Sequence, residues 1–149
     1  MIQDIRNFLP LNENLLTGGM PTAEQMKLAA EAGVRVVLNL APFDPEQDLA
    51  GEDKLAESLG MKYINIPVDW EAPTKQNLEE FIKAMDENQN GKMFVHCRAN
   101  YRAAAFIALY RVNRLGWKTE DALKDLRRIW NPKEYPVWEK FITENLPLE

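Results

Sequence analysis

The feature that most constrains the fold is a regular alternation of short apolar segments with longer segments of helical spacing. The short apolar runs predict strands at residues 15–17, 34–40, 62–66 and 92–96. Helical spacing, with capping residues or glycines at the ends, predicts helices at residues 22–33, 55–60, 74–85, 102–115, 119–129 and 137–142. Strands that alternate with helices predict a mainly parallel sheet with helices on both faces.

The length and organisation of the chain predict one domain. The chain has 149 residues, and it shows neither an internal repeat nor a linker. This length suffices for one compact domain that buries roughly 70% of its unfolded-state surface, and it is too short for two. We therefore predict a single α/β domain over residues 1–149, with three layers and a central sheet of four to five strands. Thr119 is expected to cap the helix that follows it, and Val137 is expected in the buried stripe of the last helix.

Charge and hydropathy narrow the class of protein. The net charge of -5 and the isoelectric point near 5.0 argue against electrostatic binding to nucleic acid or to a membrane surface. The first residues do not resemble a secretory signal, and no stretch approaches the roughly 20 apolar residues that cross a bilayer. We expect a cytoplasmic protein with a reduced cysteine. The sequence leaves the oligomeric state unknown.

Cys97, His96 and Ser58 are each the only residue of their type in the chain. A single cysteine forms no disulfide within the chain. A consecutive His-Cys pair does not supply the three or four ligands of a zinc site. Ser58 lies inside a predicted helix instead of on the exposed turn that a catalytic serine needs. Cys97 is therefore the only obvious nucleophile, and the sequence implies no metal and no organic cofactor.

Cys97 lies in a short connection between a predicted buried strand and a predicted helix. Sites in parallel sheets lie at the C-terminal strand ends, so the loops at residues 41–48, 67–73 and 97–102 are expected to converge. A tight turn into a helix N-terminus directs backbone N–H groups inward, where they bind an oxyanion and stabilise a thiolate. Arg102 adds a planar fork that matches two phosphate oxygens. This combination suits covalent phosphoryl transfer through a thiol.

The segment VHCRANYR resembles the signature of the cysteine-based tyrosine and dual-specificity phosphatases, which is His-Cys, five residues and Arg. Only four residues separate Cys97 from Arg102 here. The shortened loop, together with LLTGGMPTAEQM, PVDWEAPT and IWNPKEYPVW, is similar to a small bacterial branch related to the phosphatase-like domain of beta-lactamase-hydrolase-like proteins. Asn100 replaces a glycine of the family, and asparagine tolerates left-handed backbone. Ala103 replaces the usual Ser or Thr.

The resemblance implies a phosphatase-like fold and hydrolysis of phosphate monoesters through a cysteinyl-phosphate intermediate. It implies Cys97 as the nucleophile and a phosphorylated protein, above all on tyrosine, or a small aryl phosphate as the substrate. The residues expected to bind the phosphate are Arg98, Ala99, Asn100, Tyr101 and Arg102. We expect His96 to orient the loop by hydrogen bonds.

Such a reaction needs a carboxylic acid that protonates the leaving oxygen. The segment PVDWEAPT lies where the family keeps its acid loop, and Asp69 is the first candidate for the general acid. Glu71 is the second, because the spacing after Pro67 differs from the family pattern. Asp44, in the preceding loop, is the third. Trp70 either packs against a substrate ring or holds its own loop to the surface.

Two other functions stay open at this point. Rhodanese-like sulfurtransferases also place a cysteine at a strand end, in a short loop, and would carry sulfur as a Cys97 persulfide. His96 and the acidic loop favour the phosphatase instead. A phosphate-binding pseudophosphatase would keep Arg102 and the N–H groups with little or no turnover, and the missing hydroxyl at Ala103 motivates this alternative.

Overall fold

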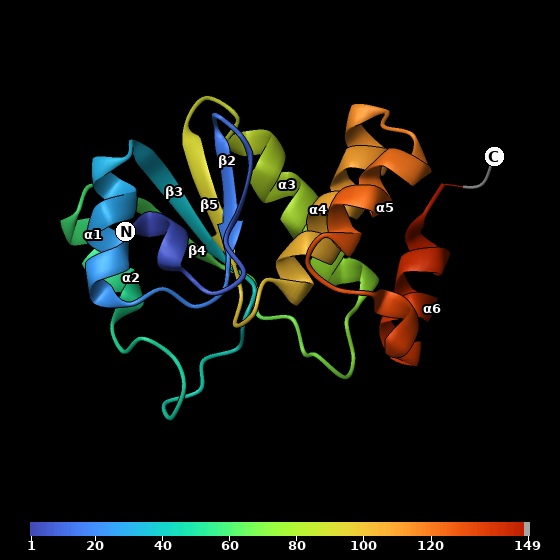
Figure 1. The fold of residues 1–149 in the computed structure, drawn as a ribbon, viewed down its shortest axis with the longest axis horizontal. Helices are drawn as coiled ribbons and strands as arrows, with labels where there is room; N and C mark the ends of the chain where they lie inside the picture. The colour runs from blue at the N-terminus through green and yellow to red at the C-terminus, as the bar shows by residue number, and fades with distance from the viewer. Residues whose placement is uncertain (148–149) are drawn as a thin grey trace.

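The computed structural model describes residues 1–147. Its centre is a β-sheet (Figure 1), which has five strands. The strands are β1 (Leu9–Asn12), β2 (Leu15–Gly18), β3 (Val34–Asn39), β4 (Lys62–Asn65) and β5 (Lys92–His96). Their order across the sheet is β1-β2-β5-β3-β4. Only β1 runs antiparallel to its neighbour, so β5 lies in the middle of a parallel set.

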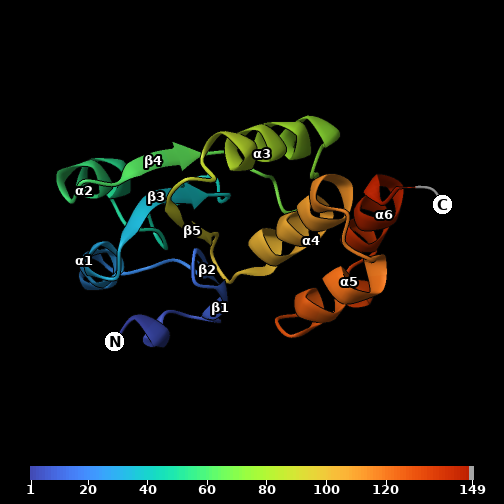
Figure 2. The ribbon, with the colours of Figure 1, turned by 90° about the horizontal axis from the view of Figure 1, so that it is seen from above.

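Helices cover both faces of the sheet (Figure 2). They are α1 (Ala23–Glu31), α2 (Glu52–Ser58), α3 (Lys75–Glu87), α4 (Tyr101–Leu115), α5 (Thr119–Arg127) and α6 (Pro136–Asn145), with short 3-10 helices at η1 (Ile2–Asp4) and η2 (Pro132–Glu134). One core cluster lies between the sheet and α1 and α2, and a larger one lies between the sheet and α3, α4, α5 and α6. The predicted three-layer α/β fold with a mainly parallel sheet is confirmed.

Local sequence signals explain where several helices begin. Thr22 and Gln25 form a capping box at α1, and Thr74 and Asn77 form one at α3. In each box, the threonine hydroxyl accepts a backbone N–H that the first helical turn leaves free. The predicted helix starts at these two threonines are confirmed.

Four details differ from the sequence predictions. The edge strand β1 was not predicted, because Pro10 lowers the strand signal; an edge position tolerates proline. Thr119 is the first residue of α5, and Lys118 occupies the cap position without a side-chain bond. Val137 is 46% exposed, so it is not part of the buried stripe. Ser58 is the exposed last residue of α2.

Within residues 1–147, no helix combines the length and the apolar character that crossing a bilayer requires.

Candidate active site

The three loops that the sequence predicts to converge do meet at the C-terminal end of β5. Arg98 reaches the loop at 41–48, where its guanidinium donates to the Pro42 carbonyl at 3.0 Å and to both oxygens of Asp48 at 3.0 and 2.8 Å. Arg102 reaches the loop at 67–73, where Nη1 donates to the Val68 carbonyl at 2.9 Å. The two arginines of the central loop therefore tie it to both neighbours.

The backbone of the Cys97 loop turns its carbonyl groups outward. The carbonyls of Cys97, Arg98 and Ala99 accept hydrogen bonds from His96 Nδ1, the Met20 amide and Asn7 Nδ2, respectively. In a trans peptide the carbonyl and the next N–H point in opposite directions, so the amides of Arg98 and Ala99 point inward. Among residues 1–147, the amides of Arg98, Ala99, Tyr101 and Arg102 have no protein acceptor. Free amides at a helix N-terminus can bind an anion, and we call these donors at the start of α4 the candidate cradle.

Asn100 closes the cradle in the left-handed conformation that its position demands, with a φ of 68°. Its buried side chain donates to the Asn7 carbonyl at 2.9 Å and to Thr17 Oγ1 at 3.0 Å. The expectation that asparagine replaces the family glycine by adopting left-handed backbone is confirmed. The side chain also fastens the loop to the N-terminal segment and to β2.

Gly19 allows a close approach between the Cys97 loop and the segment after β2. A Cβ atom at Gly19 would lie 2.5 Å from the Arg98 carbonyl oxygen and 3.1 Å from the Arg6 carbonyl oxygen. Gly19 instead forms an isolated bridge with Ala99. This role of Gly19 was not predicted, although the pair Gly18-Gly19 is a signal for a close backbone approach.

The thiol and the cation of the motif are both buried. Cys97 is 1% exposed and Arg102 is 5% exposed. Ala103, in the first turn of α4, is fully buried and offers no hydroxyl to this site. The structure thus brings together the nucleophile candidate, the cation and the amide cradle that the sequence predicts.

Behind the loop lies a buried polar network that the sequence did not reveal. His96 Nδ1 donates to the Cys97 carbonyl at 3.0 Å, and Nε2 lies 2.5 Å from Glu52 Oε2. The other oxygen of Glu52 accepts from Asn39 Nδ2 at 3.2 Å and from the Tyr63 hydroxyl at 3.5 Å. Burial and the negative charge of Glu52 raise the pKa of Tyr63 to about 12. The network connects α2, β3 and β4 to the end of β5.

The Arg98–Asp48 pair is a fixed contact at the mouth of the site. The Asp48 side chain is only 3% exposed. Burial alone would raise the pKa of Asp48, but the hydrogen bonds and charge of Arg98 outweigh it, so this pKa lies below its ordinary value of 3.8. The Arg98 side chain is thus committed to the neighbouring loop, while its amide belongs to the cradle.

The three candidate acids differ in their surroundings. Asp69 and Glu71 are both exposed on the loop after β4, and Asp69 Oδ1 accepts from the Glu71 amide at 2.9 Å. Asp44 accepts from the amide of Glu46 and from the side chain of Gln47, so it caps the turn of its own loop. Of the three, Asp69 directly follows Val68, whose carbonyl Arg102 holds.

Trp70 packs in a cluster of five aromatic side chains next to the loop. Its ring lies 5.2–6.0 Å, between centroids, from those of Tyr101, Trp130, Tyr135 and Trp138. Tyr101 in turn stacks on Trp130 with 4.9 Å between centroids. Of the two roles that the sequence left open for Trp70, the structure supports the second, which is holding its own loop to the domain.

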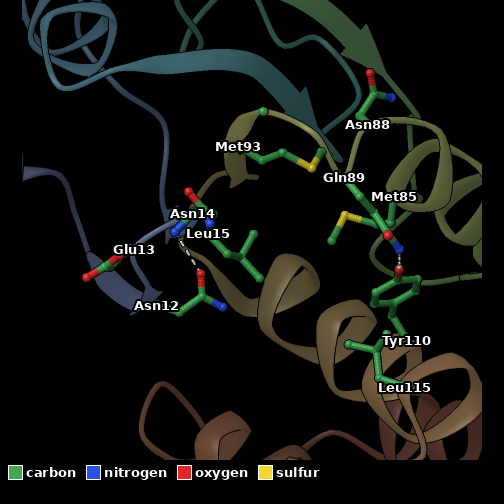
Figure 3. A pocket seen from close by; sticks show the side chains of 11 residues that line it. Asn12, Glu13, Asn14, Leu15, Met85, Asn88, Gln89, Met93, Tyr110 and Leu115 are labelled. Carbon is green, nitrogen blue, oxygen red and sulfur yellow. Dashed lines mark hydrogen bonds between the residues drawn. The ribbon is translucent and has the colours of Figure 1, made fainter.

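Two open pockets, each of 570 Å³, lie outside the cradle. One adjoins the loop and is lined by Arg6, Thr22, Gln47, Asp48 and Arg98 among others. The other lies at the opposite end of β5, between the β1–β2 turn, the end of α3 and α4 (Figure 3). Within residues 1–147, no group of three or more His, Cys, Asp or Glu side chains could hold a metal ion.

The fold and the site together define a class. The sheet is mainly parallel, and its central strand ends in a His-Cys loop that an arginine closes at a helix N-terminus. This arrangement is characteristic of the cysteine-phosphatase superfamily. A sequence model described as "DSP-PTPase phosphatase fused to NAD+ Kinase" matches residues 7–136. The chain belongs to this family, and the resemblance drawn from the sequence is confirmed.

Similar proteins agree with this assignment. The beta-lactamase hydrolase-like protein of Xylella fastidiosa strain Temecula1 is 30% identical over 105 residues, which are 68% of this chain and 24% of that protein. The chain thus spans about a quarter of the length of the curated relatives that it matches. A DUF442 protein of Shewanella putrefaciens CN-32 is 36% identical with a TM-score of 0.85, covering 97% of this chain and 91% of that one.

A more distant structure shares the fold alone. A variant of P. aeruginosa TpbA, solved in complex with pTyr, has a TM-score of 0.71 at 16% identity and covers 91% of this chain and 82% of that one.

Proposed function

We propose that this chain hydrolyses phosphate monoesters through a covalent intermediate on Cys97. The observation that carries the proposal is the ring of free backbone amides beside a buried thiol and the buried Arg102. Free amides at a helix N-terminus bind an anion with three or more oxygens, and they also stabilise a thiolate. A phosphate ester fits both requirements at the same place.

The proposed reaction has two steps. In the first, the Cys97 thiolate attacks phosphorus, so an S–P bond forms while the P–O bond to the leaving group breaks. Arg102 and the amides of residues 98–102 hold the non-bridging oxygens, and Asp69 gives its proton to the leaving oxygen. In the second, a water molecule attacks phosphorus and gives a proton to Asp69. The S–P bond then breaks, which releases phosphate and restores the thiolate.

His96 supports this chemistry from behind the loop. Its Nδ1 donates to the Cys97 carbonyl, and that bond helps keep the carbonyl turned away from the cradle. We assign it a positioning role and no role in proton transfer to substrate, because its second nitrogen already faces Glu52.

For the substrate, we propose phosphotyrosine of a protein or a small aryl phosphate. The half-buried aromatic ring of Tyr101, within the loop itself, favours an aryl ester. The distant fold relative TpbA was solved with pTyr. A net charge of -5 gives no electrostatic attraction to nucleic acid.

The proposal is tested with para-nitrophenyl phosphate and a phosphotyrosine peptide in the presence of a chelator. The wild type should hydrolyse both, and Cys97→Ser should lose the activity, because a serine hydroxyl at this site is far less ionised than a thiol. Undiminished hydrolysis by Cys97→Ser would refute the mechanism.

A pair of conservative variants identifies the general acid. Asp69→Asn should lower the rate on phenyl phosphate by about a hundredfold, the lower end of what a positioned acid contributes. Glu71→Gln leaves Asp69 unchanged and should lower this rate only slightly. The reverse result would transfer the role to Glu71.

The same preparation separates the alternative functions. A sulfurtransferase would move sulfur from thiosulfate to cyanide, and a pseudophosphatase would bind phosphate without hydrolysing either ester. We expect neither pattern, since a persulfide carrier has no use for the acidic loop at 67–73.

A further inference from the structure

The loop that carries Asp69 is clamped on both sides of that residue. Arg102 Nη1 donates to the carbonyl of Val68, the preceding residue, at 2.9 Å. Trp138 Nε1 donates to the carbonyl of Trp70, the following residue, at 2.7 Å. The two donors come from different parts of the fold, one from the Cys97 loop and one from α6. The backbone carbonyls of the residues before and after the candidate acid are therefore both held by side-chain donors.

The donor of the second clamp is fully buried, and the hydrogen bond itself is part-buried. Trp138 is 0% exposed, and its ring stacks on Trp70 with 5.2 Å between centroids. Trp130 and Tyr135 pack on the other edges of Trp70 at 5.4 and 5.3 Å. Water reaches this part-buried hydrogen bond only in part, so its loss takes a donor from the Trp70 carbonyl that water replaces poorly. The aromatic cluster thus holds the loop in one conformation.

The clamp comes from a part of the chain that the motif does not include. Trp138 belongs to α6, which packs against α4 on the side away from the sheet (Figure 2). The family match ends at residue 136, at the first residue of this helix. A buried indole N–H needs an acceptor, and Trp138 finds it in the loop that carries Asp69 instead of in its own helix or in the core.

We propose that Trp138 is a positioning residue for the general acid, and that α6 holds the loop at 67–73 so that Asp69 faces the leaving oxygen. This inference rests on the proposed function. It assigns the C-terminal helix a place in the catalytic machinery, next to a role in the core.

The test uses Trp138→Phe, which keeps an aromatic ring and removes the donor. Phe141→Leu is the matched control, because Phe141 lies one turn further along the same helix, is buried, and contacts Phe106 and Trp138. Two substrates separate acid positioning from general damage. The phenolate of phenyl phosphate needs a proton on its oxygen in order to leave. The dinitrophenolate of dinitrophenyl phosphate leaves readily as an anion.

For Trp138→Phe we expect kcat/KM on phenyl phosphate to fall about tenfold, the effect of one lost hydrogen bond to a positioned group. On dinitrophenyl phosphate it should change less than about twofold. Phe141→Leu should affect both substrates alike. Should Trp138→Phe fold poorly, Tyr135→Ala, which removes a 37% exposed member of the cluster, gives the same selective loss. An equal loss on both substrates would overturn the inference.

Hydrogen exchange supplies a readout that needs no turnover. Two amides in the loop donate to Asp69: that of Ala72 to its carbonyl at 3.1 Å, and that of Glu71 to its side chain. Both should exchange faster in Trp138→Phe than in Phe141→Leu. Unchanged exchange would overturn the clamp. Absence of hydrolysis by the wild type would instead overturn the proposed function, and exchange alone would then decide whether Trp138 holds the loop.

Discussion

Replacing Glu52 with alanine should lower the stability of this domain far more than the position of Glu52 in a short helix suggests. Glu52 is 5% exposed and faces the fully buried His96. Its removal leaves His96 Nε2 without its carboxylate and takes an acceptor from Asn39 and from Tyr63. Breaking a buried pair by removing one partner costs about 3–5 kcal/mol. That is a large part of the roughly 5–15 kcal/mol that stabilises a typical domain.

The assay is urea unfolding followed by tryptophan fluorescence, together with a thermal melt. For a domain of this size, the loss corresponds to a fall in Tm of about 6–20 °C. Glu57→Ala, an exposed glutamate of the same helix, is the control and should change stability by less than about 0.5 kcal/mol. Glu52→Gln keeps an oxygen acceptor and should fall between the two. A cost for Glu52→Ala below about 1 kcal/mol would refute the reasoning, because it would mean that the network is not desolvated.

Two further predictions follow from contacts of the Cys97 loop. Gly19→Ala should lower phosphatase activity much more than Gly18→Ala. The added Cβ at Gly19 meets the Arg98 carbonyl oxygen at 2.5 Å, whereas at Gly18 the nearest atom is a movable side-chain methyl of Ile5 at 2.8 Å. Equal activities of the two variants would contradict this. Asp48 has a lowered folded-state pKa, so its contribution to stability is present above pH 3.8 and is lost as the pH falls through the folded-state value. In acid unfolding, Asp48→Asn should therefore show a shallower decline below pH 3.8 than the wild type, and identical slopes would argue against the ion pair.

The chemically specific part of the site is readable because it is local. Cys97 and Arg102 lie in one strand-to-helix connection, and the apolar run before them and the helix after them fix where the loop stands. The left-handed residue of this loop, Asn100, also belongs to the local signal. Such features depend on neighbouring residues only. Periodicity and spacing are enough to find the loop, and the left-handed backbone of Asn100 was expected from the resemblance to the phosphatase family.

The supports of the site were not readable, because each joins residues far apart in the chain. Glu52 and His96 are 44 positions apart, and Trp70 and Trp138 are 68 apart. A glutamate at the start of a helix looks like any solvated first-turn acid. Nothing in the order of residues distinguishes one that is buried against a histidine.

The sequence by itself determined the class of fold, the nucleophile candidate and the loop that surrounds it, since helical and strand periodicity and a six-residue motif are properties of contiguous chain. Only the tertiary structure decided which residues hold that loop and its neighbouring acid loop in place. Buried hydrogen bonds and aromatic packing depend on which segments the fold brings together. Those partners exist only after β5 has taken the centre of the sheet and α6 has packed against α4.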